Sequence, residues 1–239
     1  EQLTKQYKNQ TAVNSISFEA QPGRIMGFLG PNGAGKSTTM KMLTGYIPPT
    51  SGKATVCGFD IVSQSLDVRR NIGYLPEHNP LYLEMYVKES LSFTGQMYKI
   101  DNSAKRIAEV IELTGLGAEQ HKKIGQLSKG YRQRVGLAQA IIHNPKVLIL
   151  DEPTTGLDPN QLAEIRGLIK TIGQEKTVIF STHIMQEVEA ICDQVVIINN
   201  GLIVANDQTS NLKQLLKGNK TYYFEFDKDI QVNELLRIE

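Results

Sequence analysis

Hydrophobic and polar positions near the start of the chain follow a strand period and then give way to a glycine-rich loop. Residues 15–18 alternate between polar and apolar side chains, which is typical of a strand, and the apolar run 24–29 predicts a second strand. Residues 30–35 are rich in glycine, and the stretch 36–43 predicts a helix that stops near Gly45. We therefore expect a strand, a loop and a helix in direct succession.

The middle of the chain, from about residue 81 to residue 142, changes to a helical period. Two apolar sets recur at helical spacing, one comprising Ile107, Val110, Ile111 and Leu113 and the other Tyr131, Val135, Ala138 and Ile142. Pro145 is expected to end the second helix, because proline lacks an N–H and clashes with the preceding turn. This stretch predicts an inserted helical subdomain.

Strands and helices alternate again after residue 146. Short apolar runs predict buried strands at 147–150, 177–180 and 195–198. Asp158 followed by Pro159 predicts the capped start of a helix, and Asn200-Gly201 is typical of a two-residue hairpin turn. Aliphatic strands that alternate with amphipathic helices predict a largely parallel sheet covered on both faces.

Composition narrows the class of protein. The 239 residues carry 26 basic and 25 acidic side chains, and this balance makes nucleic acid an unlikely main partner. The longest aliphatic runs are far too short to span a membrane, and the polar stretch 1–10 does not resemble a signal peptide, so we expect a soluble, cytosolic chain. We expect Cys57 and Cys192 to be buried apolar residues, because two cysteines make neither a disulfide framework nor a cysteine-based metal site.

The glycine-rich loop matches the whole P-loop pattern. Backbone N–H groups in such a loop cradle phosphates at a helix N-terminus, with Lys36 reaching the β- and γ-phosphates and the Ser37 hydroxyl binding Mg²⁺. The alternative, a glycine-rich turn with a surface lysine, does not explain the strand before the loop and the helix after it. We assign nucleotide binding to Gly30, Pro31, Asn32, Gly33, Ala34, Gly35, Lys36, Ser37 and Thr38.

Two carboxylates follow the buried run 147–150. In open α/β sheets ligands bind at the carboxyl ends of strands, which is where Asp151 and Glu152 are expected. We assign Asp151 to Mg²⁺ and Glu152 to the attacking water. A solvated acidic pair that merely ends a strand is the alternative.

A third motif opens the last helix of the middle segment. Ser128 is well placed as the N-cap of that helix, and an ordinary capped helix would explain residues 127–134 taken alone. The order of the motifs, however, resembles the nucleotide-binding subunit of ABC transporters over residues 3–215. The matching stretches are Gly30–Ser37, Leu127–Gly130, Leu148–Glu152, Gly156–Asp158 and His183.

The resemblance implies a head-to-tail dimer that holds two ATP molecules between its subunits. Ser128 and Gly130 would then face the γ-phosphate of the ATP held by the partner subunit, and Asp158 would lie at the dimer seam. His183 matches the switch histidine that contacts the γ-phosphate, and Tyr7 matches the aromatic residue that stacks on adenine. With these roles, Glu152, His183 and Lys36 form the predicted catalytic set.

The chain departs from the family pattern at two places. Lys129 and Tyr131 stand where the family usually has glycine and glutamine in its Leu-Ser-Gly-Gly-Gln stretch, and Glu77 replaces the glutamine that contacts the metal. A carboxylate is a good Mg²⁺ ligand, so Glu77 joins Ser37 and Asp151 as a candidate ligand. Both departures resemble bacterial export-type subunits of lipid, drug or gliding-motility systems.

We therefore expect an α/β fold with a P-loop NTPase core, an N-terminal antiparallel β region and an inserted α-helical subdomain. The expected ATPase domain spans 1–218, with its core in 1–80 and 146–218, its helical subdomain in 81–145 and the start of a C-terminal extension in 219–239. Its expected function is to hydrolyse ATP and so drive transport, with export favoured, through separate membrane subunits at the inner face of the cell membrane. A soluble ABC-type ATPase acting on ribosomes or DNA, and a slow-hydrolysing regulatory module, are the alternatives.

Overall fold

A six-stranded sheet forms the centre of the protein, which we describe over residues 1–211 of a computed structural model. The strand order is β10-β9-β3-β8-β7-β6, and only β10 runs antiparallel to its neighbour. The strands are β3 (Ile25–Leu29), β6 (Ile72–Leu75), β7 (Val147–Asp151), β8 (Thr177–Thr182), β9 (Gln194–Asn199) and β10 (Leu202–Gln208). This sheet confirms the predicted fold class.

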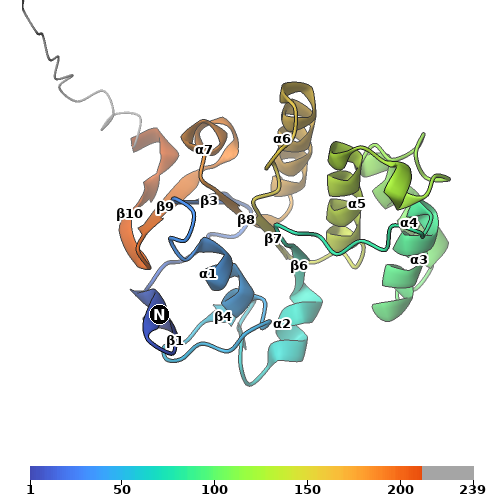
Figure 1. Cartoon of the computed structure of the whole chain (residues 1–239). Coiled ribbons are helices and arrows are strands. Elements are labelled where there is room, and N and C mark those ends of the chain that lie inside the picture. The colour runs from blue at the N-terminus through green and yellow to red at the C-terminus, as the bar shows by residue number, and fades with distance from the viewer. Residues whose placement is uncertain (212–239) are drawn as a thin grey trace, which may run out of the picture.

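Helices cover both faces of the sheet (Figure 1). On one face lie α6 (Pro159–Gly173) and α7 (Met185–Ile191), and on the other lies α1 (Lys36–Leu43), below which α2 (Ser65–Asn71) and the small antiparallel pairs are found. Those pairs are β1 (Leu3–Tyr7) with β2 (Gln10–Ile16), and β4 (Thr55–Val56) with β5 (Phe59–Asp60). Two separate hydrophobic clusters fill the space on either side, because alternate residues of each buried strand point to opposite faces.

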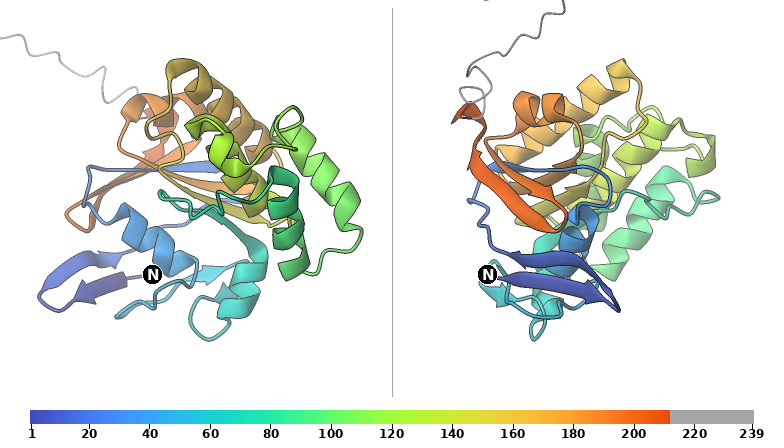
Figure 2. Two further views of the ribbon diagram at one scale, coloured as in Figure 1. Left: turned by 45° about the vertical axis from the view of Figure 1, so that its right-hand side comes forward. Right: turned by 60° about the vertical axis from the view of Figure 1, so that its left-hand side comes forward.

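Three helices of the middle segment lie together at one side of the sheet (Figures 1 and 2). They are α3 (Val87–Met97), α4 (Ser103–Leu113) and α5 (Lys129–Ile141), with a short 3₁₀ turn at Ile124–Gln126. Helix α5 packs directly on β6: a Cβ on Gly73 would collide with the carbonyl oxygen of Ala140, and one on Gly136 would lie 2.7 Å from Leu75 Cδ1. Glycine at these positions therefore brings helix and strand into close contact.

The structure corrects several local expectations. Leu113 is 42% exposed, because the buried face of α4 is made by Ile107, Val110 and Ile111 and position 113 lies off that face. Helix α5 ends at Ile141, four residues before Pro145.

Two further corrections concern the strands at the N-terminal side. Strand β2 stops at Ile16, so the alternating pattern of residues 17–18 lies outside it. Cys57 is exposed rather than buried, because Cys57 and Gly58 form the tight turn between β4 and β5 with φ of 53° and 85°. Cys192 is buried, as predicted.

Of the remaining expectations, the hairpin is tested by the structure, whereas the domain division is not. The hairpin at Asn200-Gly201 is confirmed, with φ of 48° and 75° between two antiparallel strands. The division into a core and a helical subdomain stays a prediction. The stretch 219–239 lies outside the described residues. Within residues 1–211, no helix combines the length and the apolar character that crossing a membrane requires.

His143 joins the ends of α3 and α5 and gives the fold a pH dependence. Its ring stacks on Tyr98 with the centroids 3.9 Å apart, and Nε2 lies 3.0 Å from the carbonyl oxygen of Ile72. Burial lowers the pKa of His143 to about 4 from an ordinary 6.5. The unfolded chain therefore binds this proton more readily than the folded chain between these two pKa values.

Above pH 6.5, we expect the contribution of neutral His143 to the free energy of unfolding to be fully present. We expect the free energy of unfolding to fall as the pH drops toward 4. The loss is about 2 kcal/mol once the shift is discounted for partial exposure of the ring. Urea unfolding of the wild type and of His143→Gln at several pH values measures it. Parallel pH profiles for the two proteins would contradict the expectation.

Candidate active site

The predicted catalytic side chains lie at the carboxyl edge of the parallel sheet. Strand β3 leads into the loop 30–35, β7 ends at Asp151, and β8 ends directly before His183. Asp151 pairs with Ser181 across β7 and β8, and Leu29 pairs with Thr182 across β3 and β8. Three segments that are far apart in the sequence therefore end side by side.

Glycine is required in the loop for steric reasons. Gly35 has φ of 109° and is the N-cap of α1, and a Cβ there would lie 2.6 Å from the carbonyl oxygen of Ala12. Gly33 also has a positive φ, of 78°. Along the rest of the predicted loop, Pro31 and Asn32 are exposed, Gly30, Ala34 and Lys36 are buried, and Ser37 and Thr38 are half-buried.

Lys36, Glu152 and His183 form one connected group. Lys36 Nζ lies 3.2 Å from Glu152 Oε1, and His183 Nδ1 lies 2.9 Å from Glu152 Oε2. The side chains of Lys36 and Glu152 are only 5% and 6% exposed, so this is a buried ion pair. Lys36 Nζ also donates to the carbonyl oxygen of Gly30 at 2.8 Å. The structure thus brings together the three residues predicted to be catalytic.

The backbone of Glu152 is held in an uncommon conformation. Its φ is 51°, in the left-handed region, which costs a non-glycine residue about 1 kcal/mol. Three contacts hold it there: Glu152 N donates to the carbonyl oxygen of Ser181 at 3.2 Å and to Ser181 Oγ at 3.1 Å, and Thr155 Oγ1 donates to Glu152 Oε2 at 3.2 Å. This turn aims the carboxylate at Lys36 and His183.

Asp151 and Ser37, two of the predicted Mg²⁺ ligands, lie at the end of β7 and in the first turn of α1 respectively. Ser181 Oγ donates to Asp151 Oδ1 at 2.6 Å, which fixes the orientation of the carboxylate. Within residues 1–211, no cluster of three or more His, Cys, Asp or Glu side chains could hold a metal ion. A donor set of one hydroxyl and one carboxylate fits Mg²⁺, which keeps several waters and is completed by substrate phosphates.

Glu77 lies at the same edge of the sheet. It is exposed and follows β6 by two residues. Burial raises the pKa of Tyr74 well above its usual range, and the charges of Asp151 and Glu77 raise it further. Both negative charges therefore oppose deprotonation of the Tyr74 hydroxyl. The structure gives no direct contact between Glu77 and Asp151.

The starts of α5 and α6 form a second group. Ser128 is the N-cap of α5, accepting from Tyr131 N, and Gln161 Nε2 donates to Ser128 Oγ at 3.4 Å. Asp158 is the N-cap of α6 and accepts from Gln161 N at 2.9 Å. A Cβ on Gly130 would lie 2.6 Å from Gln161 Cδ. In residues 1–211, no hydrogen bond or ion pair joins this group to Lys36, Glu152 or His183.

The model of the ABC transporter family matches residues 13–155, which include the loop, Ser128, Asp151 and Glu152. The chain belongs to the ABC transporter family. It is 42% identical over 216 residues to the uncharacterized ABC transporter ATP-binding protein YxlF of Bacillus subtilis, covering 90% of this chain and 72% of that protein. It is 38% identical over 239 residues to the bacitracin transport ATP-binding protein BcrA of Bacillus licheniformis, covering 99% and 76%. CbiO1 from Clostridium perfringens, part of the ABC transporter complex CbiONQ, is a solved structure similar to it, with a TM-score of 0.82, 29% identity and 91% of each chain covered.

Tyr7 belongs to neither of the two groups of predicted site residues in this ABC transporter chain. It ends β1 with 46% of its surface exposed, and Lys5 Nζ lies 5.2 Å from its ring centroid. The roles of Tyr7, Ser128, Gly130, Asp158 and the other site residues stay predictions.

Four residues that hold this ABC transporter site in place were missed from the sequence. Ser181 and Thr155 orient the two carboxylates, and Gln161 joins the starts of α5 and α6. Glu187 is fully buried, accepts from Thr182 Oγ1 and lies 3.5 Å from Arg166 Nη2. The sequence signal for Glu187 was that this carboxylate directly precedes Val188, which belongs to the apolar stripe of α7.

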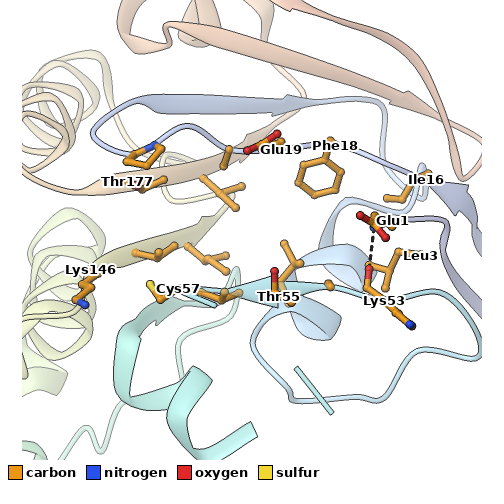
Figure 3. A pocket seen from close by; sticks show the side chains of 18 residues that line it. Glu1, Leu3, Ile16, Phe18, Glu19, Lys53, Thr55, Cys57, Lys146 and Thr177 are labelled. Atoms are coloured by element: carbon orange, nitrogen blue, oxygen red, sulfur yellow. Dashed lines mark hydrogen bonds between the residues drawn. The ribbon is translucent and has the colours of Figure 1, made fainter. Parts of the chain in front are cut away.

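A cavity of ≈ 800 Å³ lies at the other edge of the sheet (Figure 3). It is lined by Val147 and Thr177, the first residues of β7 and β8, and by the segment 53–57. Its lining includes none of the predicted site residues, so it plays no part in the chemistry below.

Proposed function

We propose that this chain is the ATP-hydrolysing subunit of a transporter whose membrane-spanning part is made by separate subunits. The observation that carries the proposal is the convergence of Lys36, Glu152 and His183 at the carboxyl edge of the sheet, directly beside a complete P-loop. The substrate of the reaction is ATP, and its products are ADP and phosphate.

Lys36, Glu152 and His183 each have one proposed role in the hydrolysis of ATP. Lys36 and the backbone of the loop bind the β- and γ-phosphates, which requires Lys36 to exchange its contact with Glu152 for the phosphate oxygens. Glu152 then accepts a proton from the attacking water, and His183 contacts the γ-phosphate. Mg²⁺, held by Ser37 and Asp151 with Glu77 as a further ligand, would neutralise charge on the phosphates.

The proposed unit is a dimer formed on ATP binding, of identical or of different ATPase subunits. Ser128 and Gly130 lie at the start of α5, and within residues 1–211 no hydrogen bond or ion pair joins them to Lys36 or Glu152 of the same chain, which agrees with a head-to-tail arrangement. Asp158, at the start of α6, would lie at the seam. Tyr7 is proposed to stack on the adenine, because its ring is half-exposed.

A membrane subunit is proposed to dock on the middle helices. Large apolar side chains are exposed on α3 and on the loop before it, namely Tyr82, Leu83, Tyr86, Phe93, Met97 and Tyr98. A pocket of ≈ 300 Å³ lies next to them, between the end of α1, β6, α3 and α5. Such a patch favours a protein partner over a solvated surface. The proposal puts the chain in the cytoplasm, on the inner face of the membrane, and export is favoured because relatives are named for bacitracin transport and Nod factor export.

The first test is the oligomeric state of Glu152→Gln. This variant keeps the shape of the side chain but cannot act as a base, so bound ATP is expected to hold the dimer closed. Light scattering is expected to give a monomer without nucleotide and a dimer with ATP and Mg²⁺. A monomer under all conditions, with ATP bound, would contradict the proposed dimer, and addition of ADP in place of ATP is the control.

A further inference from the structure

The turn that carries His183 is closed by a side chain. Thr182 is the last residue of β8, and its Oγ1 accepts from Ile184 N at 3.1 Å, so the hydroxyl spans the residue between them. The carbonyl oxygen of Thr182 accepts from Gly30 N at 3.2 Å, which ties the same residue to the glycine-rich loop. Thr182 is fully buried, whereas 40% of the His183 side chain is exposed. Thr182 therefore anchors the backbone from which this exposed ring projects.

The Thr182 hydroxyl directs its proton at Glu187. A hydroxyl has one proton to donate, and this one goes to Glu187 Oε2. The donation leaves a lone pair of Oγ1 to accept from Ile184 N. Within residues 1–211, the Thr182 hydroxyl is the one hydrogen-bond donor to the Glu187 carboxylate. The carboxylate therefore orients the hydroxyl that closes the turn at His183.

The other oxygen of this carboxylate faces helix α6. Arg166 Nη2 lies 3.5 Å from Glu187 Oε1, which is close enough for an ion pair but too long for a good hydrogen bond. Both Glu187 Oε1 and Arg166 Nε are buried and have no hydrogen-bond partner among residues 1–211. A fully buried carboxylate with a single hydrogen bond is costly. Such a costly group, in contact with the turn of His183, indicates a role in placing that residue.

We propose that Thr182 and Glu187 are positioning residues that hold the ring of His183 against Glu152. In this arrangement His183 Nδ1 lies 2.9 Å from Glu152 Oε2, and the other ring nitrogen, Nε2, is the one that meets the γ-phosphate. Thr182 and Glu187 are both buried, so they act through His183 rather than on the nucleotide. This inference rests on the role of His183 in the proposed function.

The main variant is Thr182→Val, which keeps the shape of the side chain and removes its hydroxyl. We expect kcat for ATP hydrolysis to fall about tenfold, the effect of losing one hydrogen bond on the placement of His183. The dissociation constant of ADP, which has no γ-phosphate, is expected to stay unchanged. Thr182→Ser restores the hydroxyl and is expected to recover the rate. Thr177→Val is the matched control, because Thr177 begins the same strand and its Oγ1 accepts from Gly23 N at 3.2 Å, at the opposite end of β8 from His183.

The His183→Ala background separates positioning from a structural role. Because Thr182 and Glu187 are proposed to act through His183, Thr182→Val and Glu187→Gln are expected to lower the rate of the wild type and to leave the rate of His183→Ala unchanged. Losses that multiply in the His183→Ala background would overturn the proposal, as would a wild-type rate in Thr182→Val. Glu187→Gln keeps the test open should Thr182→Val fail to fold, since it removes the charge but not the volume of the side chain.

NMR of the His183 ring gives a readout that needs no nucleotide. The chain has four histidines, so isotope-labelled histidine gives few ring signals, and their loss in His183→Ala assigns those of His183. Glu152→Gln is expected to shift these signals in the wild type and in Thr177→Val, because it changes the group 2.9 Å from Nδ1. In Thr182→Val the same shift is expected to be smaller, because the ring is no longer held at Glu152.

The two measurements keep this inference distinct from the proposed function. Equal NMR shifts in Thr182→Val and Thr177→Val would overturn the positioning role and leave the ATPase standing. A wild type without ATP hydrolysis would overturn the proposed function, and the NMR comparison would still decide whether Thr182 places the ring of His183.

Discussion

Replacing Glu152 with glutamine is expected to lower the rate of ATP hydrolysis by about 10²–10⁴-fold, the usual contribution of a general base. The amide fits the same space beside Lys36 and His183, but it cannot accept the proton of the attacking water. Phosphate release at saturating ATP and Mg²⁺ measures the rate, and equilibrium binding of ATP shows that the variant still holds its substrate.

The matched control for this measurement is Glu112→Gln, which removes the same charge from an exposed position at the end of α4. Its rate is expected to equal that of the wild type. Equal rates close to zero in the wild type and in Glu152→Gln would instead favour the regulatory module that only binds nucleotide.

Replacing Glu187 with alanine is expected to lower the free energy of unfolding by about 3 kcal/mol. Glu187 is fully buried in α7, where its carboxylate accepts from Thr182 Oγ1 and pairs with Arg166 of α6. Its removal leaves the Thr182 hydroxyl without its acceptor and the Arg166 guanidinium without its counter-charge. Urea unfolding, compared at an unchanged slope, measures the loss.

Glu189→Ala is the control, because Glu189 lies on the same helix but is only half-buried. A change within about 0.5 kcal/mol is expected there, as for most surface substitutions. Equal losses for Glu187→Ala and Glu189→Ala would show that the buried contacts of Glu187 contribute nothing beyond helix propensity.

The fold was predictable where the decisive signals are local. The strand, glycine-rich loop and helix around residues 24–43 follow from hydrophobic runs and from glycine, and the hairpin at Asn200-Gly201 follows from its turn residues. Ends of elements were less predictable. Helix α5 stops at Ile141, before Pro145 is reached, and the tight turn at Cys57 uses a residue that seldom adopts a positive φ.

The site was predictable as a set of residues but not as a set of contacts. The motifs named Lys36, Glu152 and His183, yet their contacts depend on how β3, β7 and β8 align. This alignment brings Glu152 to Lys36, more than 100 residues away, and to His183, 31 residues away. Ser181 escaped notice for the same reason, because only the pairing of β7 with β8 brings its hydroxyl to Asp151. The position of Arg166 beside Glu187 likewise depends on tertiary packing.

The close packing of α5 on β6 determines how far a rotation of the helix displaces its first residues. The contact points at Gly136 and Ala140 are one turn apart, so the close contact with β6 lies in the second half of α5, whereas Ser128 at its start contacts Gln161 of α6. At 1.5 Å per residue, Ser128 lies about 12 Å from Gly136 along the axis. A rotation of α5 by about 10° about Gly136 would displace Ser128 by roughly 2 Å, on the scale of a hydrogen-bond length. A small tilt of α5 is thus enough to make or break a contact at its first turn, such as the hydrogen bond from Gln161 to Ser128.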